Sequence, residues 1–383
     1  MKTIYKSYKY RVYPTQTQKE LLIQTFGSVR YVWNTILDWR NKEYIQNKTK
    51  INYSLSSKKL TETKSNINWL KNISSVALQQ TLKDQDIAFN NFFSKRSKFP
   101  KFKSKHSHQS FRLLSNAFSF NNGLLKIAKL KQPLNVKWSR IPKGTISSIT
   151  ISKDNSDRYF VSLLSEESVK PKPMSTHQVG IDLGLTHFVI TSNGEKYIPL
   201  KATMKYAQKL KKLQKRLSKK QHSKYKGDTT PKSKNYIKMQ KKVAKVHTKI
   251  AFSRNDFLQK LSTKLINENQ VICLENLNVV GMVKNRKLSK HISDASWSKF
   301  VSMLQYKANW YDRTLSFVST WFPSSQLCSN CGIIAGKKPL NVRNWICPNC
   351  YIEHDRDINA ANNILTAGLA GFACGDSTAR DLT

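Results

Sequence analysis

The sequence predicts an α+β protein of several modules, in which a β-rich module holds an inserted helical bundle and precedes an α/β domain with an inserted zinc ribbon. Three observations support this organisation. Strand-like alternation gives way to helical periodicity after residue 14 and returns after residue 112. Lys170-Pro171-Lys172-Pro173 forms a stiff linker, and two Cys-x2-Cys pairs stand near the C-terminus. The expected boundaries are 1–14 plus 95–172 for the β-rich module, 15–94 for the helical bundle, 173–383 for the α/β domain and 322–353 for the ribbon.

A strand and two long helices are expected in the first hundred residues. Residues 4–13 alternate between apolar and polar or basic side chains, and Pro14 ends that run. Thr17-x-x-Glu20 has the pattern of a capping box, which begins a helix. A second helical stretch covers about 75–93. The apolar positions on the two helices are Leu22, Phe26, Val29, Trp33 and Ile36, followed by Leu78, Leu82, Phe89 and Phe92.

Residues 95–112 break the helical pattern and form a basic segment without acids. Seven Lys or Arg are interleaved with Phe99, Phe102 and Phe111, a composition that suits phosphate contact together with base stacking. The alternative is a solvated basic loop whose rings anchor it to the core. We expect nucleic-acid contact here. The candidate contact residues are Lys98, Lys101, Phe102, Lys103 and Lys105.

Shorter strands complete the β-rich module and begin the α/β domain. A Ser192-Asn193-Gly194 turn joins two of the expected strands in a hairpin. The expected strands are 145–152, 158–164, 178–183, 188–191, 196–200, 271–274 and 315–321, and a helix is expected at 297–311.

Residues 201–250 are the second basic segment, with 18 Lys or Arg against the single acid Asp228. Their periodicity predicts two amphipathic helices with basic outer faces, separated by a loop around 226–231. A solvated helical hairpin is the alternative, but two adjacent basic helices repel each other unless an anion lies near them. The candidate nucleic-acid contacts in this segment are Lys211, Lys212, Lys215 and Arg216.

The charge balance indicates a polyanionic partner. The 383 residues include 66 Lys and Arg against 23 Asp and Glu, a formal net charge of +43. Such a surplus repels itself in the folded state, so nucleic acid is the first candidate partner and an anionic membrane surface the second. No apolar run approaches the roughly 18 residues of a membrane span, and the N-terminus lacks the apolar region of a signal peptide. We therefore expect a cytoplasmic, nucleoid-associated monomer without a membrane partner.

Cys328-x2-Cys331, fifteen further residues and Cys347-x2-Cys350 have the spacing of a zinc ribbon. Each Cys-x2-Cys turn aims two thiolates at one point, and two such turns complete a tetrahedron. Two redox dithiols or four unrelated thiols are the alternative, which the two intact pairs disfavour. Four sulfur ligands leave no open position, so this zinc is expected to be structural. Cys273 lies in an apolar strand and is expected to be a core thiol.

Acids at the ends of apolar strands form a second candidate metal site. Asp182 and Glu275 each end such a strand, while Asp355 and Asp357 open a helix that runs to about residue 368. A carboxylate in an apolar strand is costly unless it is paired or binds a metal. Strand, strand and helix is the arrangement of the RNase H-like fold, in which two Mg²⁺ or Mn²⁺ ions about 4 Å apart hold the attacking water and the leaving oxygen of a phosphodiester. These hard cations prefer carboxylate oxygen to thiolate.

Each acid alone has another explanation. The Gly-Ile-Asp-Leu-Gly run around Asp182 also opens the phosphate loops of actin-like ATPases, although no further glycine-rich phosphate loop follows. Glu275 could form a salt bridge on an edge strand, and Asp355 and Asp357 could cap a helix N-terminus. Their joint presence in this order favours the metal site.

Six segments together carry a resemblance to a known family. They are Gly180–Gly184, Leu274–Leu277, Phe322-Pro323-Ser324-Ser325 before Cys328, His354-Asp355-Arg356-Asp357-x-Asn359-Ala360-Ala361-x-Asn363-Ile364, Tyr10-Arg11-x-Tyr13-Pro14 and Phe99-Pro100-x-Phe102-Lys103. With them the chain resembles, over essentially its whole length, the TnpB family of transposon-encoded OrfB-type insertion-sequence proteins, relatives of the compact type V CRISPR effectors. One departure is Tyr351, where many relatives carry glycine.

The resemblance implies an RNA-guided, divalent-metal-dependent endonuclease that cleaves double-stranded DNA beside a short target-adjacent motif. Its guide is a non-coding RNA from the transposon end. The first 172 residues would form the wedge and helical recognition modules, and the rest a RuvC-like nuclease domain. The resemblance carries over Asp182, Glu275 and Asp357 as catalytic ligands of Mg²⁺ or Mn²⁺, with Asp182 bridging both ions. Asp355 competes with Asp357, because helical residues at i and i+2 point about 200° apart and only one should reach the metals.

Three other functions stay open. A guided DNA-binding regulator or transposition accessory that does not cut would be expected to have lost some of the acids, which this chain retains. A zinc-ribbon RNA-binding protein of ribosomal type explains the charge but leaves Asp182 and Glu275 without a purpose. A strand-joining transposase of the RNase H fold fits the acids as well, and only the family resemblance argues against it.

Overall fold

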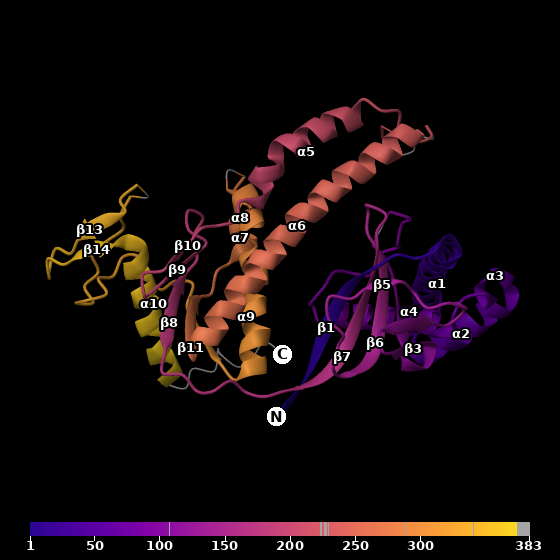
Figure 1. The fold of residues 1–383 in the computed structure, drawn as a ribbon, viewed down its shortest axis with the longest axis horizontal. Coiled ribbons are helices and arrows are strands. Elements are labelled where there is room, and N and C mark those ends of the chain that lie inside the picture. Colours follow the sequence, from indigo (N-terminus) through magenta and orange to yellow (C-terminus); the bar gives the residue numbers. More distant parts are fainter. Residues whose placement is uncertain are drawn as a thin grey trace. The chain divides into compact units, whose positions relative to one another are not determined.

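The computed structural model describes residues 1–106, 108–222, 224–225, 228, 230–286, 288–339 and 341–373, with side chains described up to residue 371. It divides into two compact units (Figure 1). One unit is Thr3–Ser168, and the other runs from Val169 onward and includes Met1–Lys2.

The N-terminal unit combines helices with a five-stranded sheet and a small hairpin (Figure 1). The sheet has the order β2-β6-β7-β1-β5, and β3 pairs with β4. The expected strands at 145–152 and 158–164 are confirmed as β6 and β7. The elements are β1 (Lys2–Val12), α1 (Gln16–Asn47), α2 (Tyr53–Asn66), α3 (Asn68–Lys71), α4 (Ser75–Phe93), β2 (Gln109–Leu114), β3 (Phe118–Asn121), β4 (Leu124–Ile127), β5 (Val136–Lys137), β6 (Thr145–Lys153) and β7 (Tyr159–Val169).

The start of α1 differs from the expected capping box. The N-cap is Thr15, whose hydroxyl accepts from the Gln18 N–H while the Gln18 side chain accepts from the Thr15 N–H at 3.0 Å. The prediction of Thr17 and Glu20 was wrong because glutamine at the third helical position closes the box as well as glutamate does. The predicted apolar face of the helix is confirmed. Its residues Leu22, Phe26, Val29, Trp33 and Ile36 are all buried.

The C-terminal unit is built on a second five-stranded sheet of order β10-β9-β8-β11-β12. The first three strands form an antiparallel meander, and β11 and β12 run parallel to β8. The expected turn is present, with Gly194 at φ 86°. Two strands are shorter than expected. Strand β10 ends at Tyr197, before Pro199, which lacks the N–H group needed for hydrogen bonding between strands. Strand β12 ends at Val318, which pairs with Glu275 at the end of β11. The strands are β8 (Gln178–Asp182), β9 (Val189–Thr191), β10 (Lys196–Tyr197), β11 (Val271–Glu275) and β12 (Thr314–Val318).

Helices cover both faces of this sheet. Figure 1 shows α5 and the outer half of α6 extending beyond the sheet, with the β13–β14 hairpin near the N-terminal end of α10. Helix α6 was expected to end near residue 250 but continues to Glu268, because its apolar stripe goes on through Leu258, Leu261 and Leu265 into the core under α9. The expected loop at 226–231 falls partly outside the described residues. The elements are α5 (Ala202–Ser218), α6 (Lys234–Glu268), α7 (Val279–Val283), α8 (Ser289–Ala295), α9 (Trp297–Tyr311), β13 (Asn344–Ile346), β14 (Glu353–Asp355) and α10 (Arg356–Ala373).

The helices that the structure describes include none that combines the length and the apolar character needed to span a bilayer.

Candidate active site and zinc ribbon

The alternation of the central strands aims the two strand acids at α10. In β11, Ile272 and Leu274 belong to the core under α6 and α9, whereas Cys273 packs on the opposite face, among residues of α10. Glu275 shares the parity of Cys273 and therefore projects toward α10 as well. The parallel register pairs Leu274 with Ile181, so the next residues, Glu275 and Asp182, stand side by side at the carboxyl ends of adjacent strands.

Close packing of α10 on the sheet depends on glycine. A Cβ at Gly180 would lie 2.0 Å from the Ala361 carbonyl oxygen, and one at Gly368 would lie 2.5 Å from the Cys273 sulfur. Asp357 is one helical turn, about 6 Å, before Ala361. Asp182 is two strand residues, about 7 Å, beyond Gly180. The contact at Gly180 therefore brings the helix carboxylate to the same edge of the sheet as the strand carboxylates.

The three acids predicted as catalytic line one cavity of about 430 Å³. The other walls come from the loop after β12, from the ribbon and from the first turns of α10. The lining residues are Asp182, Glu275, Thr320, Trp321, Phe322, Pro323, Ser324, Ser325, Gln326, Arg343, Arg356, Asp357 and Ala360.

The acidity of Asp182 is strongly perturbed by its surroundings. Burial, then the negative charges of Glu275 and Asp357, raise its pKa from the usual 3.8 to about 7. A buried carboxylate faced by two others resists ionisation unless a cation compensates the charge. This environment fits a divalent cation bound by carboxylate oxygens.

Asp355 occupies a different position from Asp357. Its carboxylate accepts hydrogen bonds from the N–H groups of Asp357 and Ile358, both at 3.0 Å, and it pairs with the Lys196 ammonium. These contacts lower the pKa of Asp355 despite its burial. Asp355 is thus the residue that caps α10, and it ends β14 instead of belonging to the helix, so the expectation that both acids are helical was wrong.

Two side chains to which the sequence analysis gave no role hold the carboxylates. The Ser324 hydroxyl donates to Glu275, and the Arg343 guanidinium lies 3.4 Å from both oxygens of Asp357. Arg343 comes from the ribbon, between the two cysteine pairs. Ser324 belongs to one of the family segments and Arg343 to none, but the contact of either residue with an acid depends on how the ribbon docks. Within the described ranges, a group of at least three possible metal ligands with mutually close donor atoms is found at the cysteines and not at these carboxylates.

The four ribbon cysteines converge as predicted. Their sulfur atoms all lie within 4.8 Å of one another, with Cys328–Cys350 at 3.6 Å and Cys331–Cys347 at 3.7 Å. Zinc–sulfur bonds of about 2.3 Å place tetrahedral sulfurs about 3.8 Å apart, whereas a disulfide needs about 2.05 Å. The donor set therefore fits a structural zinc ion. The His354 Nε2 atom lies 3.0 Å from the Cys328 sulfur and supports the cluster from outside.

Two asparagines fasten the ribbon to α10. The Asn359 side chain accepts from the Ser329 N–H at 2.8 Å and donates to the Leu327 carbonyl at 2.7 Å. Asn363 donates to the carbonyls of Ser324 and Leu327 at 2.8 and 2.9 Å. Both asparagines are buried, and they account for the spacing of the motif that follows Asp357. The cysteine turn, Ser324 and the face of α10 that carries Asp357 are thereby held as one piece.

The basic segment at 95–112 is partly anchored, as its alternative interpretation suggested. Phe111 is buried in β2, so its predicted availability for base stacking was wrong. Lys103 is half-buried with its ammonium 3.7 Å from the centre of the Trp33 ring, and burial lowers its pKa. Phe102 is 58% exposed. Lys98, Lys101 and Lys105 are exposed as well.

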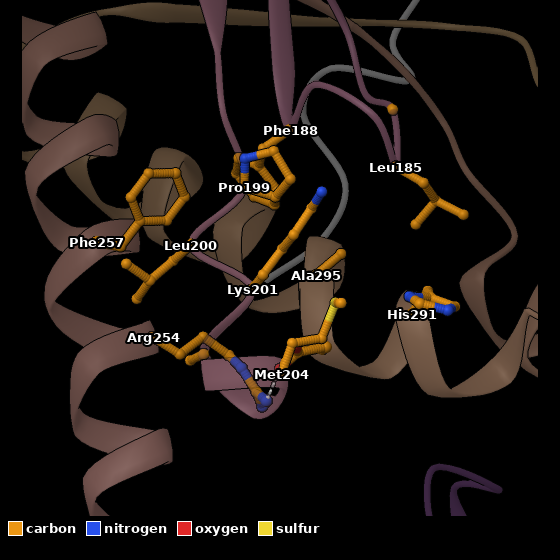
Figure 2. Close-up of a pocket in the computed structure, with 13 residues that line it drawn as sticks. Leu185, Phe188, Pro199, Leu200, Lys201, Met204, Arg254, Phe257, His291 and Ala295 are labelled. Carbon is orange, nitrogen blue, oxygen red and sulfur yellow. Dashed lines mark hydrogen bonds and ion pairs between the residues drawn. The ribbon is translucent and has the colours of Figure 1, made fainter. Parts of the chain in front are cut away.

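The second basic segment forms a helical hairpin whose outer face is exposed at Lys211, Lys212, Lys215 and Arg216. A pocket of about 50 Å³ lies at its base, and Figure 2 shows it between Arg254 of α6, Lys201 and His291 of α8. Asp294 of α8 accepts from Arg254 and from the Thr203 hydroxyl, so it ties the start of α5 to α6. This pocket is lined by none of the three carboxylates.

Comparison with known proteins identifies the family of this chain. Three family models match it: "Helix-turn-helix domain" at residues 1–49, "Probable transposase" at 160–286 and "Cas12f1-like, TNB domain" at 297–364. A protein of Streptomyces pristinaespiralis named "Putative RNA-guided DNA endonuclease" is 45% identical over 381 residues, which cover 98% of this chain and 92% of that protein. This chain belongs to the TnpB family of RNA-guided DNA endonucleases. The family resemblance carried by its motifs is thus confirmed.

Other relatives of this TnpB-family chain are more distant. The Escherichia coli protein named "Putative RNA-guided DNA endonuclease InsQ" is 29% identical over 390 residues, which cover 97% of this chain and 94% of InsQ. The TnpB-like protein L79 of Acanthamoeba polyphaga mimivirus is 24% identical over 399 residues, covering 95% and 73%. A chain of a solved Cas12f1–sgRNA–target DNA complex aligns with 94% of this chain and 99% of its own length, at 14% identity and a TM-score of 0.36.

Proposed function

We propose that this TnpB-family chain is a divalent-metal-dependent nuclease that cuts double-stranded DNA beside a short target-adjacent motif, guided by a non-coding RNA from the transposon end. The observation that carries the proposal is the cavity that Asp182, Glu275 and Asp357 share, in which burial and then the charges of the other two acids raise the pKa of Asp182 to about 7. The strand order and the acids on two strands and one helix support an RNase H-like, RuvC-like assignment of the C-terminal unit. On this assignment the first 172 residues form the wedge and recognition modules.

The three carboxylates would hold Mg²⁺ or Mn²⁺, with Asp182 placed between the other two. When bound, such ions activate a water molecule and stabilise the leaving oxygen of a phosphodiester. The chain itself orients the carboxylates: Ser324 donates a hydrogen bond to Glu275, and Arg343 forms an ion pair with Asp357. The Arg343 guanidinium also places a positive charge in the wall of the cavity. A guanidinium there suits contact with a phosphate of the substrate strand.

The exposed basic positions are proposed to bind the guide RNA and the target DNA. In the N-terminal unit these are Lys98, Lys101, Phe102 and Lys105, while Lys103 would first have to leave Trp33. On α5 they are the four exposed bases Lys211, Lys212, Lys215 and Arg216. Because phosphate contacts release counterions, binding through these residues should weaken steeply with salt.

The test is guided cleavage by the purified ribonucleoprotein. The RNA that co-purifies is sequenced, and plasmids are built with a library of flanking sequences beside a site matching its variable end. We expect linear product in Mg²⁺ from the matched plasmid with one class of flank, and no product in EDTA or from a mismatched plasmid. Guided binding without product would indicate the regulator that does not cut, and bulk ribosomal RNA in the preparation would contradict the guided mechanism.

A further inference from the structure

A second cavity, of about 570 Å³, opens beside the carboxylate cavity. The two cavities share three wall residues, Glu275, Thr320 and Trp321. The second cavity lies between the carboxyl ends of β11 and β12 and the first turns of α9. Cleavage chemistry at the three acids makes no use of it.

In the part of the chain that the structure describes, the walls of the second cavity offer a phosphate no cationic side chain to pair with. The lining contains no Lys or Arg among the described residues, and its one charged group is Glu275 at the boundary with the carboxylate cavity. The lining includes apolar residues such as Leu277, Val301 and Phe317 together with the amide residues Asn276 and Gln305. An apolar cleft with a few amide groups suits a flat, neutral ligand that offers both donors and acceptors. A nucleobase has this chemistry.

Trp321 stands at the boundary of the two cavities with its ring in solvent. The residue is 90% exposed, although the loop that carries it is fixed. Its N–H donates to the Ser319 hydroxyl at 3.3 Å, the Phe322 N–H donates to the Ser319 carbonyl at 3.0 Å, and the Thr320 hydroxyl donates to the Asn276 carbonyl. An indole displayed on a fixed loop pays little ordering entropy when a base stacks on it.

We propose that this second cavity is a nucleobase site in which Trp321 stacks on the base next to the scissile phosphate of the single strand being cut. The inference rests on the proposed nuclease function, because the two cavities share a wall and a strand held at the carboxylates continues past Trp321. Stacking accepts every base, so the site positions the strand without reading its sequence. Trp321 is a positioning residue, and its loss reduces cleavage while guided binding persists.

The test combines protein variants with substrates that lack one base. Trp321→Ala should slow cleavage roughly 5- to 150-fold, from a stacking energy of about 1–3 kcal/mol per base. Trp321→Phe, which keeps a ring, should restore most of the rate, and Trp321→Leu should not. The matched control is Tyr351→Gly, which removes another ring that is 78% exposed, at a φ of 60° that glycine accepts, and it should cleave like wild type.

Abasic nucleotides are then placed one at a time across the cut site. For the wild type, one position flanking the scissile phosphate should slow cleavage by a similar factor, and Trp321→Ala should be insensitive to the same change. A 2-aminopurine at that position should be quenched in the guided complex of Asp182→Ala and brighter when Trp321→Ala is added. Wild-type rates for Trp321→Ala, or additive effects of the variant and the abasic site, would overturn the inference. Cleavage by Asp182→Ala itself would overturn the proposed function instead.

Discussion

Asp357→Ala is expected to abolish guided cleavage, by about a thousandfold or more, while Asp355→Asn keeps the rate within about tenfold of wild type. The thousandfold loss is the size of effect seen when a group that stabilises charge in the transition state is removed from an enzyme. Asp357 lines the cavity and contributes to the raised pKa of Asp182, whereas Asp355 caps α10 and pairs with Lys196. Asparagine retains the capping oxygen, so Asp355→Asn preserves the helix start.

Single-turnover cleavage at saturating protein separates the two acids. Binding of the matched target by both variants is the control, measured in the same preparations of ribonucleoprotein. Asp355→Ala adds a third point: it removes the cap, which should lower the stability of α10 by about 1 kcal/mol without abolishing cleavage at 25 °C. An inactive Asp355→Asn together with an active Asp357→Ala would reverse the assignment.

Loss of the zinc site should have the second-largest effect. Cys347→Ser removes a buried ligand of the four-cysteine cluster, and structural zinc sites of this kind supply the folding energy of their module. The ribbon carries Arg343 and continues from the loop of Ser324, and it is fastened to α10 through Asn359 and Asn363. We expect the ribbon to unfold and cleavage to fall at least about a hundredfold, as the active site loses Arg343 and the fixed position of Glu275.

The measurements are zinc content, limited proteolysis and cleavage. Wild type should hold one zinc per chain and Cys347→Ser none, with new proteolytic cuts confined to about 322–355 and the N-terminal unit intact. Cys273→Ala is the matched control, because this buried thiol packs against α10 outside the cluster and its loss should leave the zinc in place. Full cleavage by zinc-free Cys347→Ser would contradict the supporting role of the ribbon.

The sequence predicts those parts of the site whose signal is local. The two cysteine pairs and the acids at strand ends are recognisable because spacing and apolar context alone define them. The choice between Asp355 and Asp357 could not be made in this way, since it depends on where β14 ends and α10 begins. The sequence could not predict the position of Arg343, Ser324 or Trp321 at the site, because only docking of the ribbon and of the loop after β12 brings them to the carboxylates.

In the fold as well, the sequence predicts features that depend on neighbouring residues, but not contacts between distant segments. Gly180 was noted as part of a motif around Asp182, but its function is to let α10 approach, which only the contact with the Ala361 carbonyl makes evident. Phe111 had the composition expected of a base-stacking ring and turned out to be core, because the sheet register turns it inward. Side-chain type therefore predicts chemistry better than it predicts exposure.

The central claim is that Asp182, Glu275 and Asp357 bind divalent metal ions. It is tested most directly by measuring Mn²⁺ binding to the ribonucleoprotein by electron paramagnetic resonance at pH 6 and pH 8. Metal binding must displace the proton from Asp182, whose pKa is raised to about 7, so affinity should increase by about tenfold between the two pH values. Asp182→Asn should lose the site at both pH values, and Asp355→Asn should bind Mn²⁺ like wild type. Equal Mn²⁺ affinity in wild type and Asp182→Asn would contradict the account.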